Sequence, residues 1–148
     1  MDILIQEASR DYLKGIQELV VEWGYSASEF QTQIWLEALL NSPNHNLFVA
    51  VSNGSIAGWI VVEKRISLVT EFTSEITGLV VGSTFRRSGI GHLLVNAAEE
   101  WSYNLGLSRV VVQSNVNRLE SHDFYQSIGF ELEKTSHVYA KALKKPHT

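Results

Sequence analysis

Apolar residues in the first third of the chain follow a short alternating run and then two helical runs. Residues 3–6 alternate as a short strand would, and Ser9 follows at a position typical of a helix N-cap. Gly24 ends the first predicted helix, and Ser28 with Gln31 has the pattern of a capping box that opens the second. The predicted apolar sides carry Ile16, Leu19, Val20 and Trp23 in the first helix, and Phe30, Ile34, Leu36, Leu39 and Leu40 in the second.

Three strand candidates occupy the middle of the chain. Residues 47–52 and 55–63 flank Asn53 and Gly54, a dipeptide that suits the positive backbone angles of a tight hairpin turn. A third apolar run covers residues 72–81. The sequence therefore predicts a hairpin followed by another strand.

Helices and strands alternate in the second half. An amphipathic pattern from Ile90 to Trp101 predicts a long helix, and Gly106 is its expected stop. The remaining predicted elements are a strand over 109–113, a short helix over 119–127, and a final hairpin over 130–133 and 137–143. The order is β-α-α-β-β-β-α-β-α-β-β. It predicts an α/β fold with a mixed, mostly antiparallel sheet of about 6–7 strands and helices on both faces.

Composition is that of one globular domain. The 148 residues are 45% hydrophobic and 19% charged, no linker or repeat interrupts them, and we expect residues 1–148 to form a single domain. The absence of cysteine excludes disulfides, thiolate nucleophiles and sulfur-ligated zinc. No apolar run reaches the roughly 20 residues of a membrane span, and no secretory signal pattern is present, so we expect a cytoplasmic protein.

The net charge of the chain limits the classes of partner that we expect. Sixteen acidic against twelve basic residues give a net charge of -4. This charge disfavours a nucleic-acid partner, because neutralising phosphates supplies most non-specific affinity for nucleic acids. We also expect no membrane partner. We expect no metal, since the five histidines lack the pair or cluster that metal sites favour. An anionic ligand would have to be held locally.

One stretch has the pattern of such a local anion site. Residues 80–82 end a buried strand, and residues 86–91 lead through a basic, glycine-containing turn into the long helix. Free N–H groups and the positive end of the helix dipole favour a phosphate there. Gly89 and Gly91 let the backbone approach the anion, and two arginines supply donors. A bare Gly-x-Gly also fits an ordinary helix start with solvated arginines.

Three other motifs are absent. A GxGxxG fingerprint would need glycine at Leu94 and an acidic residue after the next strand, and residues 109–114 contain none. A Walker loop occurs nowhere, and neither does the GxSxG elbow. These absences disfavour a dinucleotide enzyme, a P-loop NTPase and a Ser/His/Asp hydrolase.

Two separated motifs resemble the hallmarks of the GNAT superfamily of acetyl-CoA-dependent N-acetyltransferases. Residues 86–91, Arg-Arg-Ser-Gly-Ile-Gly, match the Arg/Gln-x-x-Gly-x-Gly/Ala signature of that family. Residues 124–130 resemble its second hallmark, an aromatic pair on the last helix followed by Gly-Phe. The spacing of the two motifs and the element order also match, so the resemblance covers nearly the whole chain.

The resemblance implies where acetyl-CoA would bind as the co-substrate. Its pyrophosphate would lie on the N–H groups of the turn and of the first helical turn. Its pantetheine arm would pair like an added strand with the end of residues 72–81, where the family splays two strands, commonly at a β-bulge. The N–H of Val81 is a candidate to stabilise the tetrahedral oxyanion. The implied cofactor residues are Leu79, Val80, Val81, Arg86, Arg87, Ser88, Gly89, Ile90, Gly91, His92 and Asn117.

The resemblance also implies catalytic residues. Tyr125 matches the family tyrosine that protonates the leaving thiolate, and a phenol with a reference pKa of about 10 is neutral at pH 7. Glu75 is the candidate base for the amine, directly or through water, because it precedes Val81 by six residues and shares its strand face if no bulge intervenes. Glu75 is equally well interpreted as an exposed strand carboxylate without a catalytic role. Glu71 and Glu120 are alternative candidates for the base.

Three positions depart from the family pattern. Arg87 stands where the family usually has glycine, and Ser88 where a basic residue or glutamine is common. Arg118 aligns best with a family asparagine that contacts pantetheine. Asn117 lies one position earlier, which leaves its assignment open.

Carboxylates and aromatic rings gather around the first two helices, the region that shapes the acceptor pocket in this family. They are Glu22, Trp23, Tyr25, Glu29 and Glu37. Such a lining would suit a small cationic amine through ion pairing and cation–π contact, although a solvated helix face fits it too. The alternatives are a non-catalytic acyl-CoA sensor and an enzyme that acetylates a protein amine. Family members often form dimers, which leaves a homodimer open.

Overall fold

A computed structural model describes residues 2–114 and 117–144, and the chain divides into two compact units, Met1–Gln113 and Ser114–Thr148. The first unit holds a five-stranded sheet. Its strands lie side by side in chain order: β1 (Ile3–Glu7), β2 (His45–Ser52), β3 (Ser55–Arg65), β4 (Thr73–Val81) and β5 (Val110–Val112). The first four strands are antiparallel to one another, and β5 is parallel to β4. The predicted mixed, mostly antiparallel sheet is therefore confirmed.

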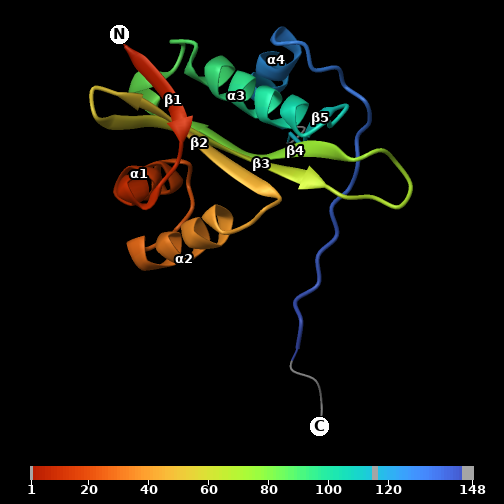
Figure 1. The fold of residues 1–148 in the computed structure, drawn as a ribbon, viewed down its shortest axis with the longest axis horizontal. Helices are drawn as coiled ribbons and strands as arrows, with labels where there is room; N and C mark the ends of the chain where they lie inside the picture. The colour runs from red at the N-terminus through yellow and green to blue at the C-terminus, as the bar shows by residue number, and fades with distance from the viewer. Residues whose placement is uncertain (1, 115–116, 145–148) are drawn as a thin grey trace. The chain divides into compact units, whose positions relative to one another are not determined.

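Helices cover both faces of this sheet. The helical elements of the first unit are η1 (Arg10–Tyr12), α1 (Leu13–Glu22), α2 (Glu29–Leu40), η2 (Ser83–Phe85) and α3 (Ile90–Asn104). Figure 1 shows α1 and α2 on one face and α3 on the other. Beneath α1 and α2 the buried core contains Ile16, Leu19, Leu36, Leu47, Val49, Trp59, Val61 and Val80. No helix in the described ranges is long and apolar enough to cross a membrane.

Local sequence signals account for most of these elements. Asn53 and Gly54 adopt the positive φ angles of the predicted turn, 50° and 80°, between β2 and β3. Ser28 and Gln31 form the predicted capping box at the start of α2. Ser9 caps η1 instead of α1, because its hydroxyl accepts the Asp11 N–H.

The apolar side of α2 differs from the prediction. Leu36 is buried, whereas Phe30 is 71% exposed and Ile34 is 51% exposed. Apolar residues surround this helix on several sides, so their spacing alone did not define which side faces the core.

The predicted final hairpin does not form. None of the residues 131–144 lies in a strand, and the last element of the described chain is α4 (Leu119–Ser127) in the second unit. The sheet of the described residues therefore has five strands instead of about 6–7, and its element order ends at α4. Residues 130–133 and 137–143 have the composition of strands, but an isolated two-stranded hairpin is marginally stable without neighbouring strands or helices to pack against.

Candidate active site

A β-bulge interrupts β4 at Thr77. Val61 of β3 lies opposite Gly78 and Val62 lies opposite Ile76, so Thr77 is an extra residue on β4. On the other edge of β4, the described parallel pairing with β5 runs from Ser74 to Ile76. The pairing thus ends where the bulge begins, and the last five residues of β4 lie beyond the β4–β5 pairing. The bulge and the end of the described pairing coincide in the strand where the resemblance implied a splay, and an extended ligand could add to that edge.

The bulge changes the face on which Glu75 lies. Three register pairs define that face: Glu75 with Glu63, Gly78 with Val61, and Val80 with Trp59. Directly opposite residues in an antiparallel pair share a face, and Val80 belongs to the core beneath α1 and α2. Glu75 therefore shares a face with Val80. Glu75 and Val81 were predicted to share a face only if no bulge intervenes. Thr77 is such a bulge, so the alternation shifts by one residue and the two residues lie on opposite faces.

The turn from β4 into α3 has two left-handed residues. Gly89 is the N-cap of α3 with a φ of 83°, and Arg87 has a φ of 63°. No side chain caps this helix, and the first helical hydrogen bond runs from the Leu93 N–H to the Gly89 carbonyl at 3.1 Å. The N–H groups of residues 90–92 precede that bond, so they and the helix dipole form an electropositive end. The turn predicted as a phosphate cradle thus leads into α3 through a left-handed glycine with free N–H groups after it, and its binding of phosphate stays a prediction.

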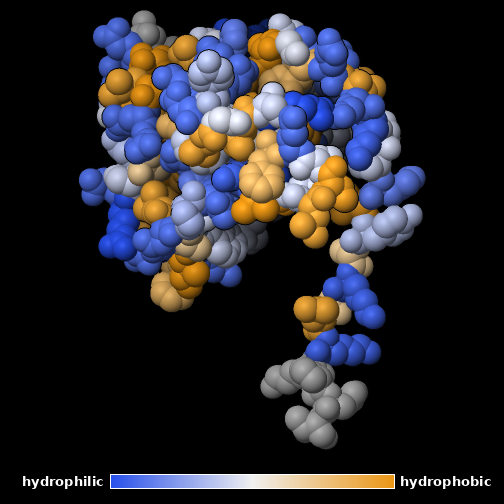
Figure 2. All heavy atoms as spheres, turned by 45° about the vertical axis from the view of Figure 1, so that its right-hand side comes forward, coloured by the Kyte–Doolittle hydropathy of each residue, from blue (hydrophilic) through white to orange (hydrophobic). Residues whose placement is uncertain are grey.

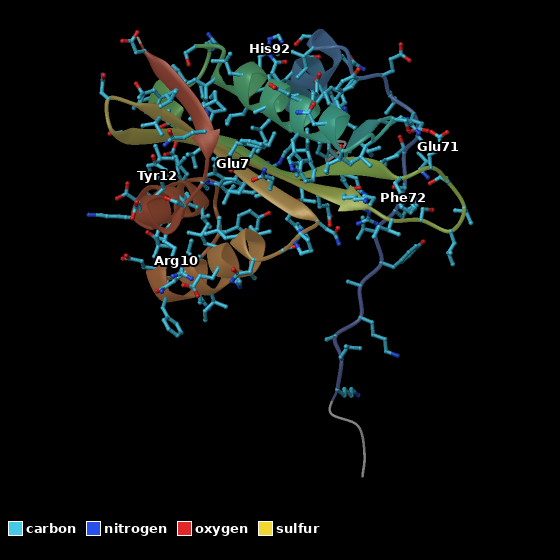
Figure 3. The ribbon with its side chains drawn as sticks, in the orientation of Figure 1. Glu7, Arg10, Tyr12, Glu71, Phe72 and His92 are labelled. Carbon is cyan, nitrogen blue, oxygen red and sulfur yellow. The ribbon has the colours of Figure 1, made fainter. Side chains whose placement is uncertain are left out.

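The polar side chains of this turn lie at its surface. The Arg86 Nε donates to the Val81 carbonyl at 3.4 Å, which links the turn to the end of β4. The Ser88 hydroxyl donates to the Phe85 carbonyl. Arg86, Arg87, Ser88 and His92 are all exposed. Figure 3 shows His92 on α3, on the opposite side of the sheet from Arg10 and Tyr12. The structure therefore brings the predicted residues of the turn and of β4 together in the first unit.

Glu22, at the end of α1, has a contact that the sequence did not reveal. Its Oε1 accepts the Ser83 N–H at 2.6 Å, across 61 residues of chain. The hydrogen bonds from the Ser83 backbone and side chain lower the pKa of the Glu22 carboxyl, and the charge of Arg86 lowers it further. The prediction placed Glu22 in the acceptor lining, whereas in the structure its carboxylate accepts the Ser83 N–H in the turn that leads from β4 to α3.

Aromatic rings gather beside the bulge on the α1 side of the sheet. Trp23 makes edge-to-face contacts with Tyr25 and Trp59, at centroid distances of 5.0 and 5.9 Å. A Cβ on Gly78 would lie 2.8 Å from the Trp59 Cζ3, so glycine lets that ring lie against the β4 backbone. Tyr25 is 56% exposed. This aromatic cluster and Glu75 lie on one face of the sheet, because Glu75 and Gly78 share that face.

The two other carboxylates predicted for the acceptor lining, Glu37 and Glu29, differ in their surroundings. Glu37 pairs with Arg10 at 3.3 Å, so its charge is partly matched within the chain. Glu29 lies exposed in the first turn of α2. The region thus keeps its aromatic rings and Glu29, while Glu22 and Glu37 have partners of their own.

Tyr125 belongs to the second unit and is held by the end of α4. Gly129 has a φ of 99°, its N–H donates to the Gln126 carbonyl at 3.3 Å, and the Phe130 N–H donates to the Tyr125 carbonyl at 3.0 Å. These two bonds form a Schellman motif, and the Phe130 ring packs on the Tyr125 ring at 5.6 Å. The Gly-Phe hallmark is therefore the helix stop that orients Tyr125.

Burial raises the pKa of the Tyr125 phenol above its usual value near 10. The phenol is therefore protonated at neutral pH. Asn117 also lies in the second unit, just before α4, and Glu120 lies in the first turn of α4.

Glu71 lies near the start of β4, at the opposite end of that strand from the turn that leads into α3. With Lys64 and Phe72 it lines a cavity of about 430 Å³ at the β3–β4 hairpin, where Figure 3 shows Glu71 and Phe72. Figure 2 brings this side forward and shows apolar side chains there among polar ones. Residues 74–81 of β4 separate Glu71 from the turn by roughly 25 Å, at about 3.3 Å per residue. Glu71 therefore lies farther from Val81 along the chain than Glu75 does, which makes it the weaker candidate for the base.

No group of three or more His, Cys, Asp or Glu side chains in the described part of the chain could hold a metal ion.

Comparison with known proteins agrees with this geometry. The model of the Acetyltransferase (GNAT) family matches residues 5–130, and the chain belongs to that family and is an acyltransferase of the N-acetyltransferase type. Enzymes of this family use acetyl-CoA.

Two curated relatives and two solved structures illustrate the likeness. The chain is 28% identical to an uncharacterized N-acetyltransferase, YhdJ of Bacillus subtilis, over 81% of this chain and 91% of that protein. It is 32% identical to the aminoalkylphosphonate N-acetyltransferase of Salmonella typhimurium, over 72% of this chain and 68% of that protein.

The two solved structures share the fold at lower identity. The aminoglycoside acetyltransferase AAC(6')-Iy, bound to a bisubstrate analog of CoA and acetylneamine, has a TM-score of 0.88 at 19% identity, over 97% of this chain and 100% of that one. The 6'-N-acetyltransferase AAC(6')-IG of Acinetobacter haemolyticus has a TM-score of 0.83 at 23% identity, over 95% and 99% of the two chains.

Proposed function

We propose that this protein transfers the acetyl group of acetyl-CoA to a primary amine of a small cationic acceptor, by direct attack in a ternary complex. One observation carries the proposal: the bulged end of β4 leads into a left-handed, uncapped turn at the start of α3. The family match runs from residue 5 to residue 130 and so includes parts of both compact units. We therefore propose that residues 1–148 work as one acetyltransferase domain.

The cofactor is proposed to lie along the turn and the adjacent edge of β4. The N–H groups of Ile90, Gly91 and His92 would bind the pyrophosphate, with Gly89 and Ser88 shaping the turn. Arg86 and Arg87 add positive charge, and the exposure of both lets them reach a phosphate in solvent. The pantetheine arm would follow Leu79 to Val81 beyond the described β4–β5 pairing. Asn117 is a further candidate contact for that arm.

The reaction is proposed to proceed in one transfer. The amine nitrogen forms a bond to the thioester carbonyl carbon, and the resulting oxyanion accepts a hydrogen bond from the Val81 N–H. The C–S bond then breaks, and the thiolate takes the proton of the Tyr125 phenol. The amine loses its extra proton to water, or to Glu75 through intervening water molecules, because Glu75 lies five ladder positions, roughly 17 Å, from Val81 along the strands. The chain has no cysteine, which is consistent with transfer that forms no acetyl-cysteine intermediate.

The acceptor is proposed to bind at the aromatic cluster of Trp23 and Tyr25. This cluster lies on the same sheet face as Glu75, and Glu75 is two ladder positions, roughly 7 Å, from Gly78. The Tyr25 ring is open to solvent and suits a cation–π contact with an ammonium group. The curated relative that acetylates an aminoalkylphosphonate and the similar aminoglycoside enzymes support a small amine as the acceptor class.

A panel of amines tests the acceptor class. Thiol release from acetyl-CoA is measured with small di- and polyamines, with neutral amines, and with peptides that have a free N-terminus. We expect turnover with small cationic amines, and Tyr25→Ala should raise the acceptor KM while leaving the KM for acetyl-CoA unchanged. Turnover with peptides alone would favour modification of a protein amine. Tight binding of CoA without turnover on any amine would favour an acyl-CoA sensor.

A further inference from the structure

We propose that Glu22 is a positioning residue for the turn between β4 and α3, residues 82–89, which we call the cofactor turn. Glu22 holds this turn in its binding shape before acetyl-CoA arrives. The inference rests on the proposed function, because it takes this turn as the pyrophosphate site. Its starting observation is the 2.6 Å hydrogen bond from the Ser83 N–H to the Glu22 Oε1. Glu22 is the last residue of α1 and Ser83 is the first residue of η2.

Glu22 takes the place of a missing helix cap. The residue at the N-cap of η2 is Gly82, which has no side chain to accept an N–H of the first turn. A carboxylate from α1 instead accepts the N–H of the first residue of η2, Ser83, where negative charge is favoured by the free N–H groups. The other two side-chain bonds of the turn are local, from Arg86 to Val81 and from Ser88 to Phe85. The Glu22 bond instead ties the turn to a different element of the fold.

The last turn of α1 also supports the residue before Ser83. Gly82 is buried, its N–H donates to the Ala57 carbonyl at 2.8 Å, and a Cβ there would lie 3.3 Å from the Leu19 Cδ2. Leu19 and Glu22 are three residues apart, so they lie on one side of α1. One side of α1 therefore lies against Gly82 and Ser83, the two consecutive residues at which the exposed turn begins.

Glu22 has two opposing effects on an anionic cofactor. As a hydrogen-bond acceptor it pre-organises the turn, which lowers the ordering cost of binding. As a negative charge close to Arg86 it draws that guanidinium and repels phosphate. The variant Glu22→Gln keeps an acceptor oxygen and removes the charge, whereas Glu22→Ala removes both. The two variants therefore separate positioning from charge.

The test is isothermal titration of CoA into the full-length protein and its variants. Loss of a helix cap corresponds to about fivefold in an equilibrium constant, so Glu22→Ala should raise the Kd for CoA by about fivefold. Glu22→Gln should bind CoA within about twofold of the wild type. The KM for acetyl-CoA should follow the Kd, while kcat at saturating acetyl-CoA stays unchanged. Glu18→Ala, an exposed glutamate one turn earlier on α1, is the matched control and should bind like the wild type.

Ser83→Pro tests the same hydrogen bond by removing its donor, the Ser83 N–H, instead of its acceptor. Proline suits the first position of a helical turn but has no N–H, so this variant should weaken CoA binding as Glu22→Ala does. The double variant should be no weaker than either single one, because both remove the same bond. Melting temperatures within a few degrees of the wild type should confirm that the variants fold.

Distinct results overturn the inference and the proposed function. If the wild type binds CoA and Glu22→Ala binds it equally well, the positioning role is refuted while the cofactor site stands. The positioning role also fails if Glu22→Gln loses as much affinity as Glu22→Ala, or if the losses of Glu22→Ala and Ser83→Pro add. A wild-type protein that binds no CoA refutes the proposed function itself.

Discussion

Replacing Gly89 by alanine should weaken CoA binding through the backbone alone. Gly89 is the N-cap of α3 and has a φ of 83°, a left-handed angle that costs a residue with a side chain about 1–2 kcal/mol. A Cβ built at Gly89 meets no atom within 4 Å, so alanine adds that cost without a clash. The alanine variant escapes that cost only by moving the turn out of its left-handed conformation, which displaces the N–H groups of residues 90–92 that a bound pyrophosphate requires. The cost therefore appears in affinity, as roughly a 5- to 30-fold higher Kd for CoA by isothermal titration.

Gly106→Ala is the matched control. Gly106 follows the other end of α3 with a φ of 78°, and a Cβ there also meets no atom within 4 Å. This variant should lower the melting temperature by a few degrees for the same backbone reason and leave the Kd for CoA unchanged. Wild-type affinity in Gly89→Ala, or an equal loss of affinity in Gly106→Ala, would refute the claim that the left-handed start of α3 shapes the phosphate site.

Three further variants test the catalytic residues. Tyr125→Phe should lower kcat by roughly 10²- to 10⁴-fold with the Kd for CoA unchanged, and an unchanged kcat would remove Tyr125 from the mechanism. Because burial raises the pKa of the Tyr125 phenol, the wild-type kcat should show no loss from this group between pH 7 and about 10, and a falling limb that Tyr125→Phe abolishes within that range would contradict the assignment. Gly129→Ala places a side chain at a φ of 99° and should lower the free energy of unfolding by about 1–2 kcal/mol in urea titrations; full stability would show that the Schellman motif does not hold Tyr125. Glu75→Gln should lower kcat at neutral pH and recover activity as the pH approaches the pKa of the acceptor amine, whereas wild-type kcat at pH 7 would assign deprotonation to water.

Most of the first unit could be predicted because its signals are local. The Asn53–Gly54 turn, the capping box at Ser28 and the long amphipathic pattern of α3 each act within a few residues. The final hairpin over 130–133 and 137–143 failed because strand pairing depends on neighbours that a local pattern does not contain. For the same reason the spacing of Phe30 and Ile34 did not show which side of α2 faces solvent.

For the candidate site, the motif of residues 86–91 predicted a glycine-containing turn at the start of the long helix, and its binding of phosphate stays a prediction. The turn has two left-handed residues, Gly89 and Arg87, and Arg87, with a φ of 63°, stands where the family usually has glycine. The face of Glu75 could be predicted only on the condition that β4 has no bulge, and the extra residue that forms the bulge, Thr77, leaves no mark in the sequence. The role of Glu22 could not be predicted because its partner Ser83 is 61 residues away.

The most direct test of direct acetyl transfer is the stoichiometry of the reaction. The full-length protein is incubated with acetyl-CoA, with and without a small cationic amine, and thiol, acetylated amine and protein mass are measured together. We expect one thiol and one N-acetylated amine per turnover, no thiol release above background without amine, and no acetylated protein. Thiol release without acetylated amine, or a protein that gains an acetyl group and passes it on, would contradict transfer in a ternary complex.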